Sequence, residues 1–190
     1  MVSVQKNWLQ ICGGFLISDY SETLTVVVGA HDLKNKTEGS VCIRVKSYHQ
    51  HPDFTEEPVM NDMMLLKLEK KVTQNEKVNR ISIPIKEEEI EVHSVCSVAG
   101  WGRLDTNGSL SNRLMEIHVK IMNNIICTVS TNGDSGGPLV CGKTAVGVTS
   151  FGDPNLCNSP ELPEVYMKVS AYLQWLHTSL LEMFIDLIWP

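Results

Sequence analysis

A serine set among glycines is the strongest chemical signal in the sequence. Residues 132–141 read NGDSGGPLVC, with Ser135 near the centre of the string. Glycine leaves the backbone N–H groups bare, so a reacting carbonyl group can approach them closely. We predict that Ser135 is a nucleophile and that the N–H groups of Gly133 and Ser135 form an oxyanion hole. An ordinary Gly-rich turn is the alternative, but the full string is far more specific than a lone G-x-S-x-G motif.

The elements that would position this serine are mostly short strands. Alternating or continuous apolar runs, bounded by Gly, Asn and Pro, predict strands. They lie at 15–17, 24–28, 41–46, 63–68, 81–85, 94–99, 115–121, 139–140, 145–149 and 165–169. Only the tail has a helical period, with Ser170 as the predicted N-cap of a helix over about 170–188. Many short strands with one terminal helix predict an all-β barrel or sandwich.

Composition and charge narrow the class of protein. The chain has 190 residues, of which 43% are apolar and 20% charged, as expected of a single globular domain. Sixteen Lys and Arg against 22 Asp and Glu give a net charge of −6, which argues against nucleic acid as a partner. The longest apolar stretch, at 180–189, contains Glu182 and Asp186 and is shorter than the ~20 residues of a membrane span. We therefore also expect no membrane association.

Cysteine and histidine spacing gives little sign of a metal site. The six cysteines, at 12, 42, 96, 127, 141 and 157, include no C-x-x-C pair, which excludes a zinc ribbon. Their even number and wide spacing are compatible with long-range disulfides in a secreted protein. The first ten residues have no signal-peptide pattern, so we expect an upstream segment to be missing. His49 and His51 form an H-x-H without a third ligand nearby, and we expect a surface loop, no metal and no cofactor.

Six motifs occur in the order of a known family. They are CGGFLI at 12–17, VGAHDL at 28–33, NDMMLLKL at 61–68, VAGWG at 98–102, GDSGGPLVC at 133–141 and PEVYMKV at 163–169. With them the chain resembles the chymotrypsin/trypsin family of serine endopeptidases over nearly its whole length. The GAHDL motif and the YHQHPDF at 48–54 look most like its granzyme and mast-cell protease branch. The resemblance implies one trypsin-like double β-barrel domain, with a first, incomplete barrel over about 1–90, a second barrel over about 91–169, and the C-terminal helix.

The resemblance also implies roles for individual residues. Asp62 matches the aspartate that orients the catalytic histidine of the family. Ser150, Phe151 and Gly152 match the floor of the substrate cleft, whose backbone pairs with an extended peptide. Glu164 falls where the family lines its specificity pocket, and a carboxylate there would favour substrates with Lys or Arg.

Further implications concern cysteines, partners and location. Cys96 and Cys141 match a disulfide pair of the family, which leaves the other four cysteines as free, buried thiols. By resemblance, the partners are polypeptide substrates or protein inhibitors, the protein is secreted or stored in secretory granules, and it is a monomer.

Departures from the family bear on activity. The family carries Thr-Ala-Ala-His-Cys after its CGG motif, whereas here Tyr20 runs directly into Ser21. His31 resembles the end of that motif but belongs to the separate GAHDL landmark. The mature N-terminus Ile-Ile-Gly-Gly is absent, which would leave Asp134 without its usual partner, and residues 126–134 are short for the pocket wall. We expect a relative of the serine endopeptidases that is itself inactive, because the catalytic histidine and the mature N-terminus are absent from this sequence. The alternatives are a non-catalytic homologue that binds peptides or inhibitors, and an incomplete gene product.

Overall fold

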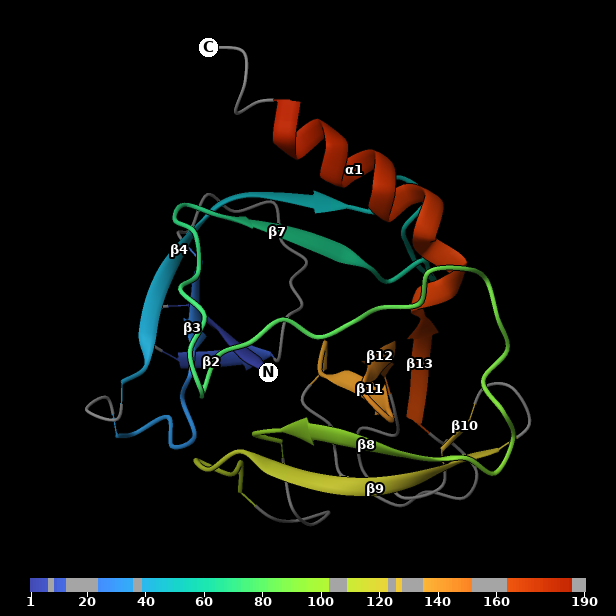
Figure 1. Cartoon of the computed structure of the whole chain (residues 1–190), viewed down its shortest axis with the longest axis horizontal. Helices are drawn as coiled ribbons and strands as arrows, with labels where there is room; N and C mark the ends of the chain where they lie inside the picture. Colours follow the sequence, from blue (N-terminus) through green and yellow to red (C-terminus); the bar gives the residue numbers. More distant parts are fainter. Residues whose placement is uncertain are drawn as a thin grey trace.

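Antiparallel strands form two units, a sheet from the first half of the chain and a barrel from the second, followed by a helix (Figure 1). The computed structural model describes residues 1–6, 9–12, 24–35, 39–102, 109–122, 126–127, 135–151 and 164–185. The strand predicted at 15–17 lies outside these residues.

The first unit is a five-stranded sheet in the order β2-β1-β3-β4-β7. Its β-branched residues alternate between the two faces, so that Val26 and Val28 of β3 share one buried core with Val4 and Ile43. Val26 lies directly opposite Ile43 in the sheet. The strands are β1 (Val2–Lys6), β2 (Leu9–Cys12), β3 (Thr25–Val28), β4 (Val41–Gln50) and β7 (Met64–Leu68), and between the last two lies a small hairpin of β5 (Thr55–Glu56) and β6 (Val59–Met60).

The second unit is a closed barrel in the order β10-β13-β12-β11-β8-β9. Alternate residues point inward, and the core contains Cys96 and Val98 of β8, Val119 and Ile121 of β9, and Leu139 of β11. Closure pairs every edge, so β12 is held on both sides by its neighbours. The strands are β8 (Val95–Gly100), β9 (Met115–Met122), β10 (Ile126–Cys127), β11 (Pro138–Cys141), β12 (Thr144–Phe151) and β13 (Glu164–Lys168).

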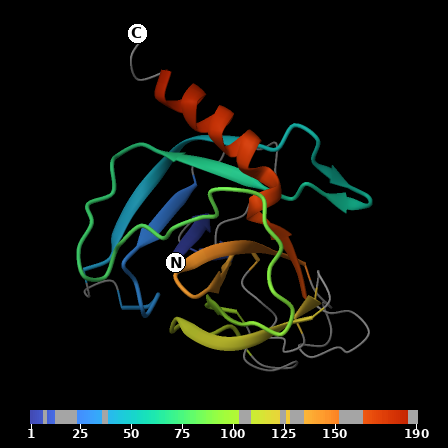
Figure 2. The same ribbon diagram turned by 45° about the vertical axis from the view of Figure 1, so that its right-hand side comes forward.

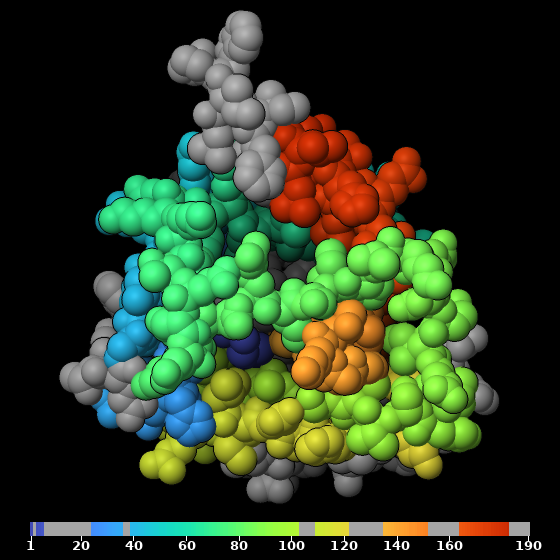
Figure 3. Space-filling model, in the orientation of Figure 1, coloured from blue at the N-terminus to red at the C-terminus, as the bar shows by residue number. Residues whose placement is uncertain are grey.

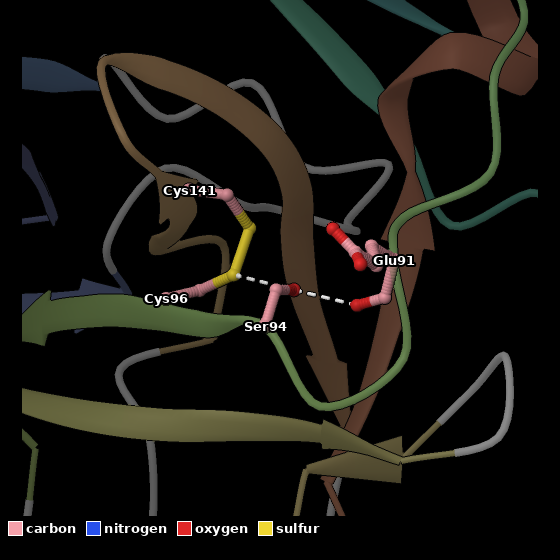
Figure 4. Close-up of a disulfide and its surroundings, with 4 residues drawn as sticks. All are labelled: Glu91, Ser94, Cys96 and Cys141. Atoms are coloured by element: carbon pink, nitrogen blue, oxygen red, sulfur yellow. Dashed lines mark hydrogen bonds between the residues drawn. A yellow bond between two sulfur atoms is a disulfide. The ribbon is translucent and has the colours of Figure 1, made fainter.

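A disulfide joins two neighbouring strands of the barrel. Cys96 of β8 and Cys141 of β11 are bonded, with their Cα atoms 4.3 Å apart, which confirms the predicted pair. Figure 4 shows the bond beside Ser94, whose hydroxyl donates to the carbonyl oxygen of Glu91 at 2.7 Å. The prediction that the remaining thiols are buried is wrong for Cys42, which is free but exposed on β4. The side chains of the other three cysteines lie outside the described residues.

Hydrogen bonds and a long connecting segment link the sheet to the barrel. The carbonyl oxygen of His31 accepts hydrogen bonds from Leu114 N at 2.7 Å and from Trp101 Nε1 at 3.1 Å. Trp101 is only 1% exposed, so this indole fills the junction. Residues 69–94, green in the space-filling view, cross the front of the molecule from β7 to β8 (Figure 3).

The chain ends in a 3-10 turn, η1 (Val169–Tyr172), that runs into helix α1 (Leu173–Ile185) beside β4 and β7 (Figures 1 and 2). Trp175 of α1 packs on the ring of His51, with ring centroids 5.0 Å apart. The helix was correctly predicted, but Ser170 is not its N-cap. Its buried hydroxyl lies inside the 3-10 turn and donates instead to the carbonyl oxygen of Glu88 at 3.3 Å. Residues 186–188 of the predicted helix lie outside the described residues.

The strand predicted at 81–85 is wrong. This segment makes only one isolated bridge, between Ser82 and Thr144. Ile81, Ile83 and Ile85 are all exposed, the last by 91%. Pro84 has no N–H to donate to a ladder, so the alternating pattern cannot extend into a paired strand.

Candidate active site

Asp62 is positioned by a left-handed turn just before β7. Asn61 has a φ of 53°, a conformation that Asn tolerates better than most residues. Met63 N donates to the carbonyl oxygen of Asn61 at 2.7 Å, and His51 N donates to that of Met63 at 3.0 Å. Both Asp62 and Met63 are 6% exposed. The turn therefore buries the carboxylate where the first sheet faces the barrel.

A hydrogen bond across the two units fixes one oxygen of that carboxylate. Ser150 Oγ, from β12 of the barrel, donates to Asp62 Oδ2, although the two residues are 88 positions apart. Both side chains are buried. The structure therefore brings together two of the predicted site residues. The resemblance assigned only the backbone of Ser150 a role in the cleft. The hydrogen bond from its side chain to Asp62 could not be predicted from any local sequence pattern.

Ser135 lies on an exposed turn that is tied to the same strand. Gly136 N donates to the carbonyl oxygen of Thr149 at 2.7 Å, and Thr149 N donates to that of Gly137 at 2.9 Å. Gly136 has a φ of 82°, which favours glycine. Since Thr149 precedes Ser150, this connection brings the Ser135 turn to the strand that binds Asp62. Gly133, the other predicted oxyanion residue, lies outside the described residues.

The second carboxylate oxygen, Asp62 Oδ1, is buried and has no hydrogen-bond partner among the described residues. Burial raises the pKa of Asp62, and the hydrogen bond from Ser150 lowers it by a smaller amount, so that the net direction is upward. Nearby, burial and then the charge of Asp62 raise the pKa of Tyr172. The Tyr172 hydroxyl lies 3.4 Å from Asn61 Oδ1 and 3.5 Å from Met167 Sδ. Tyr172 is thus a neighbour of the site that sequence reasoning did not single out.

All six histidines lie in the described part of the chain, and none of them forms a hydrogen bond there with Asp62 or Ser135. His51 Nδ1 accepts from Asp53 N at 3.2 Å, and its ring stacks edge-on against Tyr172. His49 Nε2 lies 3.1 Å from Ser47 Oγ. Within the same residues, no group of three His, Cys, Asp or Glu side chains is placed to hold a metal ion.

Two residues predicted to contact substrate lie at the paired ends of β12 and β13. Phe151 ends β12 opposite Val165 and is 45% exposed. Glu164 begins β13 opposite Cys127 and is 5% exposed. Gly152 lies outside the described residues. The exposed Phe151 thus pairs with the residue that follows the buried Glu164. That these two side chains contact the substrate stays a prediction.

Comparison with known proteins decides the family. The family model described as Trypsin matches residues 1–176. The chain belongs to the trypsin family. Its relatives include duodenase-1 of Bos taurus, 32% identical over 90% of this chain and 78% of that protein, and granzyme B(G,H) of Mus musculus, 34% identical over 87% and 78%. The solved structure of neuropsin, a serine protease expressed in the limbic system of mouse brain, has a TM-score of 0.82 at 26% identity, covering 94% of this chain and 93% of that one.

These relatives confirm the predicted trypsin-like fold and the granzyme branch of the trypsin family. Among the described residues, no helix is long and apolar enough to cross a membrane.

Burial of the Asp62 carboxylate predicts that the free energy of unfolding depends on pH. Because the folded-state pKa of Asp62 is raised, the folded protein binds more protons than the unfolded chain between the two pKa values. The free energy of unfolding should therefore fall as pH rises through that window. Asp62→Asn carries no charge at any pH, so its stability should not fall across this window, and relative to the parent it should become more stable as the pH rises.

Urea denaturation across a pH series measures this difference, which should shrink below the window. The matched control is Asp53→Asn, since Asp53 lies on an exposed loop nearby and should leave stability unchanged. A difference between Asp62→Asn and the parent that stays constant over the whole series would contradict the prediction.

Proposed function

We propose that this chain is a serine-peptidase homologue that binds extended polypeptides or protein inhibitors but hydrolyses peptide bonds very weakly. The proposal rests on how the two carboxylate oxygens of Asp62 are hydrogen-bonded. One carboxylate oxygen is held by Ser150, and the other is buried without a partner among the described residues. In the trypsin family, the aspartate receives an N–H from a histidine that takes the proton of the nucleophilic serine.

The proposed weakness in catalysis lies in the general base. Ser135 supplies the nucleophile and Asp62 the orienting carboxylate, but the sequence lacks the family's His-bearing motif between Cys12 and Leu24. A serine hydroxyl at neutral pH needs an adjacent base to become nucleophilic. Acyl transfer at Ser135 should therefore be slow even though the Ser135 turn and Asp62 are both held by β12.

Binding of polypeptides is the activity that the remaining site supports. β12 ends at Phe151, which presents an exposed aromatic ring where the family pairs its substrates in strand-addition style. Granzymes, cathepsin G and mast-cell proteases among the relatives support the same class of partner and a secretory or granule location.

Labelling with a fluorophosphonate probe tests the catalytic part of the proposal. The folded, disulfide-bonded chain should label no more than its Ser135→Ala variant, while a complete granzyme should label fully under the same conditions. Strong labelling that disappears in Ser135→Ala would show that the chain has a working base. His31→Ala would then be the first variant to make.

A preference for basic side chains is expected from Glu164. We propose that this buried carboxylate lines the pocket and favours peptides carrying Lys or Arg over matched Leu peptides. Glu164→Gln keeps the volume and removes the charge, and it should weaken binding of a Lys peptide about tenfold, which equals about 1.4 kcal/mol. Fluorescence anisotropy with labelled peptides measures the change. Glu182→Gln, an exposed change on α1, is the control, and an equal loss for Lys and Leu peptides would remove Glu164 from the pocket.

A further inference from the structure

Three isoleucines are exposed on the segment that connects β7 to β8. Ile81, Ile83 and Ile85 are 49%, 40% and 91% exposed, whereas Pro84 between them is buried. The isoleucines therefore face solvent while Pro84 anchors the segment on the protein. Single exposed apolar side chains are common on protein surfaces, but several together beside charged residues are typical of an interaction site.

Contacts on both sides of the isoleucines fix the backbone of this segment. Ala145 N donates to the carbonyl oxygen of Ser82 at 2.8 Å, and Ile90 packs against the core of the barrel. The carbonyl oxygen of Glu88 accepts from Ser170 Oγ at 3.3 Å. The isoleucines cannot turn inward without breaking these contacts, so their exposure follows from the fold.

Four exposed glutamates follow the isoleucines, at positions 87, 88, 89 and 91. Glu89 is paired with Lys168, whose Nζ lies 2.9 Å from Glu89 Oε1. Within the described chain, Glu87, Glu88 and Glu91 form no ion pair. An apolar surface is thus continued by a surface that carries uncompensated negative charge.

We call the three isoleucines (81, 83 and 85) and the three glutamates without an ion pair (87, 88 and 91) the linker face. We propose that the linker face binds a basic polypeptide segment whose apolar and cationic side chains lie in separate blocks. The apolar block would cover the isoleucines, and Arg side chains would reach the carboxylates, with which a guanidinium group can form two parallel hydrogen bonds. Arg80 and Lys86 flank the isoleucines and are exposed, so cations mixed into the apolar block would be repelled. A second copy of this chain is a poor partner, because its own net charge is −6.

The linker face is separate from the site at Asp62. Ser82 bridges to Thr144 at the start of β12, whereas Ser150, which bonds to Asp62, lies near the other end of that strand. A rise of about 3.3 Å per residue puts Thr144 and Ser150 about 20 Å apart along the strand. The segment that carries the linker face forms part of the front surface in Figure 3. This inference therefore goes beyond the proposed function, and either can fail without the other.

The test uses the full, disulfide-bonded chain and a fluorescein-labelled peptide with three leucines at alternate positions, a short Gly-Ser spacer and three arginines. Fluorescence anisotropy should show saturable binding that weakens as salt is added. A control peptide of the same composition, with its leucines and arginines interleaved, should bind about tenfold more weakly. Equal affinity of the two peptides would indicate only general attraction to an acidic chain and would overturn the proposal, as would the absence of saturable binding.

The apolar part of the linker face is tested by replacing two isoleucines together. Ile83→Ser with Ile85→Ser should weaken binding of the block peptide about tenfold. Leu181→Ser, at an exposed apolar position on α1, is the control and should leave binding unchanged. Since all three side chains are exposed, the Tm should stay near that of the parent. An equal loss of binding in the control variant would contradict the proposal.

The acidic part is tested by removing two charges. Glu87→Gln with Glu88→Gln should weaken binding about fivefold and flatten its salt dependence. The matched control, Glu56→Gln with Glu57→Gln, removes the same charge from exposed positions of the β5–β6 hairpin and should have little effect. The same loss in both pairs would mean that net charge alone attracts the peptide, contrary to the proposal.

Glu164→Gln distinguishes the linker face from the pocket that Glu164 is proposed to line. Affinity for the block peptide should be unchanged in this variant. A loss confined to Glu164→Gln would place the peptide in the pocket, which would overturn this inference and leave the proposed function intact. Sedimentation of the chain alone gives the last outcome. Self-association that disappears in the variant of Ile83 and Ile85 would assign the linker face to a second copy and would also overturn the inference.

Discussion

Peptide-ester hydrolysis by this chain should be about a million-fold slower than by a trypsin-family enzyme with a complete triad. The reason is that nucleophile, base and orienting carboxylate act as a unit, so that absence of the base removes nearly the whole contribution of Ser135 and Asp62. Steady-state kcat values with a chromogenic ester, measured beside a granzyme relative, test the size of the deficit.

The same cooperativity predicts almost no further loss on removing the remaining members. Ser135→Ala and Asp62→Asn should each change the residual rate by no more than about threefold, whereas either change is severe in a complete triad. A drop of a hundredfold or more in Ser135→Ala would mean that the serine is activated in the parent. The proposed function would then be wrong, whatever the absolute rate.

Strands and cores were predictable because their signals are local. The β-branched run that forms β3 and the period-two pattern of β4 both bury one face, and Val26 meets Ile43 as such alternation requires. The barrel core follows the same rule on β8 and β9. The turn at Ser135 was also readable, since Gly136 takes a positive φ that its sequence string anticipates.

Contacts between distant segments could not be read from these patterns. The bond between Ser150 and Asp62 joins residues 88 positions apart, and only the family resemblance pointed to both residues. The Ser170 hydroxyl bonds to Glu88, 82 positions away, which overrides its local preference for an N-cap. Likewise, Ile81, Ile83 and Ile85 alternate like a strand, but the segment that carries them spans two units and has no neighbour to complete a ladder among the described residues.

The largest expected effect on stability concerns the disulfide of the barrel. Cys96 and Cys141 close a loop with a separation of 45 residues. A link of this length restricts the unfolded chain and is expected to contribute about 4 kcal/mol. Replacing both cysteines by Ala should lower the free energy of unfolding by about that amount, which is a large share of the ~5–15 kcal/mol that stabilises most domains. Alanine is preferred to serine because Cys96 is 2% exposed in an apolar core, where a hydroxyl would be costly.

Urea denaturation of the oxidised proteins measures this loss, and the exposed free thiol provides the control. Cys42→Ser should stay within about 0.5 kcal/mol of the parent, because it removes neither a bond nor buried packing. A reducing agent should destabilise the parent and Cys42→Ser alike, and leave the double variant unchanged. If the double variant lost less than about 1 kcal/mol, the bond would contribute little to the stability of the barrel, and the strand pairing of β8 with β11 would suffice to hold these two strands together.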